Sequence, residues 1–267
     1  MAEPAAQLPA VQHLVVRYAK RGKMRFASHR DVARVFERGV RRAGLPIAYS
    51  AGFTPHPRIS YAGGAPTGVA SEAEYLALAL TSREAATRVR ERLNETLPDG
   101  IDVIEVTDAA SGAEQAQGGK GGQASSLQFA ASQWQVVLPG LEPAAAERAV
   151  AGFLALSAAP VERLTDKGVR RLDARAAVVT LDVLGSADPD GGPRAAVTDS
   201  QDCATLRMVI LHTTPAVRPD DVLTALGAQY GLVPSVPSII TRLAQGSLAL
   251  LAGETVLWRH CGGAGEP

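Results

Sequence analysis

Residues 23–58 read KMRFASHRDVARVFERGVRRAGLPIAYSAGFTPHPR and contain the clearest helix signal in the chain. Ser28 is a favourable N-cap residue, and Asp31 three positions later completes a pattern resembling a capping box. Gly44, followed closely by Pro46, predicts where the helix ends. At helical spacing the apolar residues share one face, namely Val32, Val35, Phe36, Val40 and Ala43. Arginines occupy an arc of about 120° on the other side, namely Arg30, Arg34, Arg38, Arg41 and Arg42.

The same region concentrates positive charge in a chain whose formal net charge is zero. Residues 17–58 include eleven basic residues but only two acidic ones, Asp31 and Glu37, which gives this segment a net charge of +9. A localised cationic surface usually binds a polyanion. The alternative is a solvated helix face in an arginine-rich chain. The local shortage of acids favours phosphate binding.

The alternation of apolar segments predicts an α+β fold with two halves. In the first half we expect helices at 28–44 and 83–97 and strands at 11–19, 47–50, 74–81 and 101–106. In the second half we expect helices at 143–156 and 218–230, a basic turn at 166–175, and strands at 134–138, 161–164, 176–184, 204–213 and 238–251. Each half fits the order βαββαβ, so the sequence predicts two tandem ferredoxin-like halves.

Stretches of small polar residues set the expected domain boundaries. We expect an N-terminal domain at 1–108, a flexible Gly/Ala/Gln-rich linker at 109–132, a C-terminal domain at 133–260 and a tail at 261–267. Residues 185–202 are expected to form a disordered loop within the second domain.

Composition argues against several classes of protein. No apolar run approaches the ~20 residues that cross a bilayer, and the N-terminus lacks the features of a signal peptide. The two cysteines, Cys203 and Cys261, lie far apart with no CxxC motif, which disfavours a disulfide framework, a zinc ribbon or an iron–sulfur cluster. We therefore expect a cytoplasmic protein with no membrane contact, no metal and no cofactor.

Two histidines are the candidate catalytic residues. His56 lies between Pro55 and Pro57, which restrict its backbone, and His29 lies in the first turn of the expected helix. If they converged, they could act as general acid and base on an RNA 2′-hydroxyl. The alternatives are a stiff surface turn for His56 and a solvated helix residue for His29. Without a visible third group, the sequence leaves open whether the chain is an enzyme.

Aromatic residues are interleaved with the cations, and five of the chain's twelve, besides the core candidate Phe36, lie between residues 18 and 61. Such a mixture fits base stacking beside phosphate contacts. Glu72 and Glu74, two positions apart on an expected strand, suggest a polar strand face. The predicted RNA- or phosphate-binding residues are Arg17, Lys23, Arg25, Arg30, Arg34, Arg38, Arg41, Arg42, Tyr49, Phe53, His56, Arg58, Lys167, Arg170 and Arg171.

Residues 23–80, from KMRFASHRDVARVF through GFTPHPRISYAGGAPTG to EYLALAL, closely resemble the opening of the radical-SAM-linked protein family. This uncharacterised domain is fused to radical-SAM proteins or encoded beside them. The resemblance extends over about Val16–Gly100. The matching positions include Phe26, Ser28, His29, Asp31, Arg41, Leu45, Pro46, Tyr49, Gly52, Phe53, Pro55, His56, Pro57, Gly68, Ser71, Glu74 and Tyr75.

The resemblance implies an RNA setting, because standalone actinobacterial members are associated with radical-SAM proteins and an RNase E/G-type ribonuclease. The chain lacks the CxxxCxxC motif, so it cannot be the radical-SAM catalytic half. We expect an RNA-binding accessory protein that presents structured RNA, such as tRNA or rRNA, to a radical-SAM modifying enzyme or a ribonuclease. Two alternatives stay open: a metal-independent endoribonuclease using His29 or His56, and an adaptor whose cationic face docks an acidic protein.

Overall fold

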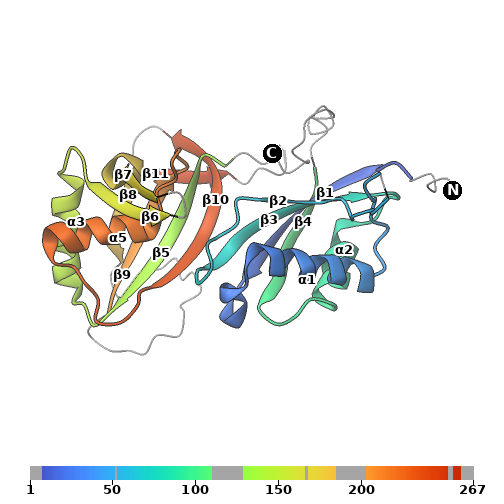
Figure 1. The fold of residues 1–267 in the computed structure, drawn as a ribbon, viewed down its shortest axis with the longest axis horizontal. Helices are drawn as coiled ribbons and strands as arrows, with labels where there is room; N and C mark the ends of the chain where they lie inside the picture. Colours follow the sequence, from blue (N-terminus) through green and yellow to red (C-terminus); the bar gives the residue numbers. More distant parts are fainter. Residues whose placement is uncertain are drawn as a thin grey trace. The chain divides into compact units, whose positions relative to one another are not determined.

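The structure is a computed structural model that describes residues 8–51, 53–109, 129–165, 168–184, 203–251 and 255–259. The described residues form two compact units, one within residues 8–109 and the other within residues 129–259. Each unit combines antiparallel strands with a few helices (Figure 1). The expected α+β class is therefore confirmed, whereas the ferredoxin-like assignment of the two halves stays a prediction.

The first unit is a four-stranded antiparallel sheet with its helices packed on one face. In chain order its elements are β1 (Gln12–Lys20), the 3₁₀ helix η1 (Gly22–Phe26), α1 (His29–Arg42), β2 (Ile59–Ala62), β3 (Ala70–Leu80), α2 (Ala86–Asn94) and β4 (Ile101–Asp108). The strands are hydrogen-bonded in the order β4-β1-β3-β2, and every neighbouring pair is antiparallel. Both α-helices lie on one face of the sheet (Figure 1). Their buried side chains form one apolar core with side chains of the strands.

Phe36 of α1 lies at the centre of this core and is 0% exposed. Its ring packs edge-on against Tyr18 of β1, with the centroids 4.7 Å apart, and against Tyr61 of β2 at 6.4 Å. Because residues alternate along a strand, Leu14 and Val16 of β1 share the face of Tyr18 and are also fully buried. These contacts determine which side of α1 faces the sheet.

The helix signal of the sequence is confirmed. The Ser28 hydroxyl accepts the Asp31 N–H at 3.3 Å, and the Asp31 carboxylate accepts the Ser28 N–H at 3.3 Å. This capping box starts α1 at His29 by giving partners to amides that the helix leaves unpaired. The helix ends at Arg42, and Gly44 then adopts a left-handed φ of +58°, which glycine tolerates without strain.

The second strand of the first unit was predicted in the wrong place. Residues 47–50 make only isolated bridges, whereas β2 forms at Ile59–Ala62 within the expected loop. Prolines explain the difference, because Pro46, Pro55 and Pro57 have no N–H to donate to a ladder. The segment from Ile59 to Ala62 has no proline and pairs along its length with β3.

The second unit has the same arrangement of four principal strands. Its elements are β5 (Ala131–Pro139), α3 (Pro143–Leu154), β6 (Pro160–Thr165), β7 (Gly168–Asp173), α4 (Ala174–Ala177), β8 (Val178–Leu184), β9 (Cys203–Leu211), α5 (Pro219–Tyr230), β10 (Ile239–Leu251) and β11 (Thr255–Arg259). The principal strands pair antiparallel in the order β10-β5-β9-β8, and β11 pairs with β10. Strands β6 and β7 form a separate two-stranded hairpin.

The expected basic turn at 166–175 is instead mostly regular structure. Residues 168–173 form β7, and a short helix follows at 174–177. Val161 and Leu172 face each other across the hairpin and are buried, while Glu162 accepts a 2.8 Å hydrogen bond from Arg171. These pairings lie about ten residues apart in the chain, so composition alone did not show them.

Several predicted segments lie wholly or largely outside the described residues. Residues 110–128 of the expected linker, the loop 185–202 and the tail 261–267 belong to them, and β5 begins at Ala131. None of the helices in the described ranges is long and apolar enough to cross a membrane.

The burial of Phe36 predicts a large effect on stability. Replacing Phe36 with alanine leaves a cavity between α1 and the sheet and should lower the free energy of unfolding by about 3–5 kcal/mol. The matched control is Phe53→Ala, at a side chain that is 98% exposed. It should leave the urea midpoint, followed by circular dichroism, unchanged. Equal shifts for the two variants would contradict this packing.

Candidate functional site

The exposed side of α1 carries five arginines, which we call the arginine face: Arg30, Arg34, Arg38, Arg41 and Arg42. All five are exposed, on the side opposite the buried Val32, Phe36 and Val40. Arg34 lies 3.8 Å from Asp31, with 72% of its side chain exposed. The other four arginines form no ion pair with any described residue.

The sequence after α1 adds no negative charge to this surface. Residues 38–71 contain no aspartate or glutamate, although they include Arg38, Arg41, Arg42 and Arg58. Arg58 is also exposed, in the segment that leads to β2. Within residues 23–71, only Asp31 and Glu37 of α1 therefore oppose the positive charge of the arginine face.

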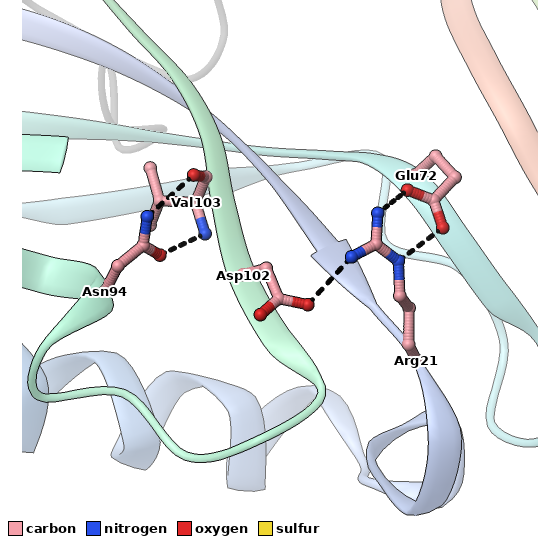
Figure 2. Close-up of polar contacts among 5 residues, drawn as sticks. All are labelled: Arg21, Glu72, Asn94, Asp102 and Val103. Atoms are coloured by element: carbon pink, nitrogen blue, oxygen red, sulfur yellow. Dashed lines mark hydrogen bonds and ion pairs between the residues drawn. The ribbon is translucent and has the colours of Figure 1, made fainter. Parts of the chain in front are cut away.

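Cations nearer the sheet have acidic partners within the protein. Arg17 lies on the face of β1 away from the helices, where its Nε contacts Glu105 Oε2 at 3.3 Å. The Arg21 Nε donates to Glu72 Oε1 at 2.7 Å, its Nη2 donates to the other oxygen, and its Nη1 donates to Asp102 at 2.9 Å (Figure 2). The hydrogen bond to Glu72 is the main cause of a raised Arg21 pKa.

This ion-pair cluster anchors the turn between β1 and η1 to β3 and β4. It also supplies the partner of Glu72 that the sequence did not show, because the Glu72 carboxylate holds Arg21. Nearby, the Asn94 side chain donates to the Val103 carbonyl at 3.0 Å and accepts the Val103 N–H at 2.7 Å (Figure 2). The end of α2 is thereby fixed to β4.

Two buried charged residues hold the loop at residues 63–68, which we call the glycine loop. Lys20 and Glu74 are each only 3% exposed. The Lys20 ammonium donates to the carbonyls of Ala65 and Pro66 at 3.2 and 3.3 Å, while Glu74 accepts the Ala65 N–H at 3.1 Å. The sequence analysis missed both roles. Each strand carries a second charged residue, Arg17 in β1 and Glu72 in β3, so no local signal in the sequence singles these two out.

His29 lies against the glycine loop. Its ring meets Tyr61 edge-on, with the centroids 5.2 Å apart. A Cβ added to Gly64 would lie 3.6 Å from His29 Nδ1 and 3.9 Å from Glu74 Oε2, so these two groups approach the same point. The Tyr61 hydroxyl donates to the Ala33 carbonyl at 3.5 Å. Burial, together with the nearby Glu37, raises the Tyr61 pKa.

His56 lies elsewhere, in the segment from Tyr49 to Arg58, which we call the proline loop. Its backbone carbonyl accepts the Ser50 N–H at 2.8 Å, and its side chain is exposed. The loop is attached near Ala79 of β3, about five residues or roughly 16 Å from Glu74 along the strand. No hydrogen bond or ring contact between described residues joins His29 and His56, so the structure does not bring the two candidates together.

The remaining predicted site residues fall into two groups. In the first unit, Lys23, Tyr49 and Phe53 are exposed, and the Arg25 guanidinium lies 4.6 Å from the Phe26 ring centroid. In the second unit, Arg170 and Arg171 are exposed on β7, whereas Lys167 lies outside the described residues. Among the residues that the structure describes, no group of three His, Cys, Asp or Glu side chains could hold a metal ion.

The sequence pattern of the DUF2344 family, described as an uncharacterized protein conserved in bacteria, matches residues 13–219. The chain belongs to this family. The DUF2344 match includes the arginine face, the glycine loop and the proline loop. The description of the DUF2344 family names neither radical-SAM proteins nor RNA, so these links stay predictions. No protein of curated function matches the chain.

The buried contacts of Lys20 predict that it stabilises the glycine loop. Changing Lys20 to methionine leaves the Ala65 and Pro66 carbonyls without their donor and should lower the free energy of unfolding by about 2–4 kcal/mol. The matched control is Lys23→Met, at an exposed lysine. Urea denaturation should show little change for the control, and similar losses for both variants would contradict the assigned role.

The capping box predicts a pKa that can be measured directly. Hydrogen bonds from Ser28, with a smaller effect of Arg34, lower the pKa of Asp31. A lowered folded pKa stabilises the protein at higher pH, and this stability is lost as the pH falls below about 4. In Ser28→Ala the Asp31 pKa should rise, as measured by NMR of the carboxyl carbon. Ser82→Ala should leave it unchanged, and an unaltered pKa in Ser28→Ala would contradict the assignment.

Proposed function

We propose that the first unit binds structured RNA through the arginine face of α1. The observation that carries the proposal is a set of five exposed arginines on one helix face, where they outnumber the two acids of the same helix, Asp31 and Glu37. From Arg30 to Arg41 they are spaced three or four residues apart, which is about 4.5–6 Å along the helix axis. Guanidinium groups bind phosphate oxygens through two parallel hydrogen bonds, so such a row suits a phosphodiester backbone.

Exposed aromatic side chains add support for RNA as the partner. Phe26, Tyr49 and Phe53 are all exposed in the first unit, and Arg25 already lies over Phe26. Nucleic-acid bases stack on aromatic rings beside phosphate contacts.

We further propose that the protein is an accessory factor acting beside an enzyme that modifies or cleaves RNA. The resemblance to radical-SAM-linked proteins supports a radical-SAM modifying enzyme or a ribonuclease as that partner, tRNA or rRNA as the substrate and the cytoplasm as the location. The strand orders β4-β1-β3-β2 and β10-β5-β9-β8 support two tandem ferredoxin-like halves. The separation of His29 from His56 gives the endoribonuclease alternative no support.

Charge reversal on α1 tests the proposal. The triple variant Arg34→Glu, Arg38→Glu and Arg41→Glu should bind fluorescently labelled tRNA at least ten times more weakly, as measured by anisotropy. Each lost phosphate contact should also reduce the slope of log affinity against log salt by about one.

A second triple variant supplies the matched control. Reversing Arg83, Arg88 and Arg90, which are exposed on and before α2, changes the net charge by the same amount. It should retain most of the affinity, because binding depends on the arginine face rather than on total charge. Wild-type binding without salt dependence, or equal losses in both variants, would refute the proposed interface.

A further inference from the structure

The proline loop is closed at its base by backbone hydrogen bonds. The Arg58 N–H donates to the Ala48 carbonyl at 2.8 Å, and the Ser50 N–H donates to the His56 carbonyl at 2.8 Å. The His56 N–H donates in turn to the Ser50 hydroxyl at 3.0 Å. Pro55 and Pro57 further restrict this part of the backbone. Ala51 and residues 53–55 therefore form a short tip on a fixed base.

Phe53 lies in this tip, and 98% of its surface is exposed. It is the most exposed large apolar side chain among those described, in a chain with only 4% aromatic residues. Tyr49, at the base of the same loop, is 40% exposed. A single exposed apolar residue is ordinary in proteins. A fully exposed ring at the tip of a hydrogen-bonded loop with no acidic residue is a more specific feature.

The arginine face leads toward this loop. Helix α1 begins beside Tyr61 and Gly64, near the Glu74 end of β3. It ends near the other end of β3, where the Pro46 carbonyl accepts the Thr81 N–H at 2.8 Å. The proline loop is attached at that same end, because the Ala48 N–H donates to the Ala79 carbonyl at 2.8 Å. A backbone lying along α1 would thus run toward the base of the loop that carries Phe53.

We infer that Phe53 stacks on the base of an unpaired nucleotide, and that the RNA bound by this protein presents such a nucleotide next to its phosphate contacts. The inference rests on the proposed function and names its substrate class. In a double helix both faces of each base are covered by neighbouring bases, so a protruding ring has nothing to stack on. Loops, bulges and ends of RNA expose free base faces, which aromatic side chains bind.

The loop and the helix would then have separate tasks. The arginines contact phosphates, which give affinity without regard to base pairing. Phe53 selects for a nucleotide that has left the stack, and the exposed Arg58 beside the loop can contact its phosphate. The closed base of the loop reduces the conformational entropy that binding would otherwise remove.

The test compares two RNAs with the full-length protein. One is a hairpin whose unpaired loop carries a fluorescent adenine analogue, and the other is the same stem as an uninterrupted duplex. Wild-type protein should prefer the hairpin and quench the fluorescence of the analogue. Phe53→Ala should weaken hairpin binding by about 5- to 150-fold, with little effect on the duplex. Phe53→Trp should keep the preference, and Phe53→Leu, which retains apolar area without a ring, should lose it.

The outcomes separate this inference from the proposed function. If Phe53→Ala binds both RNAs as wild type does, with binding still dependent on salt and on the arginine face, base stacking is wrong and the proposed function stands. If wild-type protein prefers the duplex, the inferred substrate class is wrong. If the wild type binds neither RNA, both proposals fail together.

Discussion

The burial of Phe36 between α1 and the sheet is the contact on which the rest of the first unit depends. Its ring lies against Tyr18 and Tyr61, which come from strands on either side of α1 in the sequence. Once this side of the helix is buried, residues about half a turn away must face solvent. The exposure of the arginine face is therefore a consequence of core packing. The same contact places the start of α1, with His29, beside Tyr61.

Electrostatics divides the basic residues of residues 17–58 into two functional groups. Arg17 and Arg21 are held by carboxylates, and Lys20 is buried against two carbonyls. These cations stabilise the sheet and its loops. Their existing contacts leave them less available to a binding partner than the exposed arginines of α1. The arginines of α1 have no such constraints apart from the long contact between Arg34 and Asp31. The net charge of residues 17–58 therefore overstates the charge that is available to a ligand, because some of these cations are buried or paired with carboxylates.

Local signals made α1 predictable, and distant partners explain what the sequence did not reveal. The capping box and the apolar spacing of α1 depend on residues within four positions of one another. In contrast, β2 needs β3 as its partner, and the hairpin of β6 and β7 depends on cross-strand pairs such as Val161 with Leu172. The roles of Lys20 and Glu74 arise because both reach Ala65, which lies far from Lys20 in the chain. The spacing of residues in the sequence does not indicate that Lys20 and Glu74 both contact Ala65.

The two ends of α1 differ in a way that bears on how a ligand would be recognised. The start of the helix is tightly constrained, because the glycine loop there is held by Lys20 and the buried Glu74. His29 lies against the same loop at Gly64. At the other end the chain leads into the proline loop, where the backbone is fixed but Phe53 remains open to solvent. A rigid base combined with an uncovered ring is suited to contact with a planar ligand, because little freedom remains to be lost. In the proposed function, the arginines between these ends would contribute affinity over a longer distance. Recognition of shape is therefore expected at the Phe53 end, and recognition of charge along the helix.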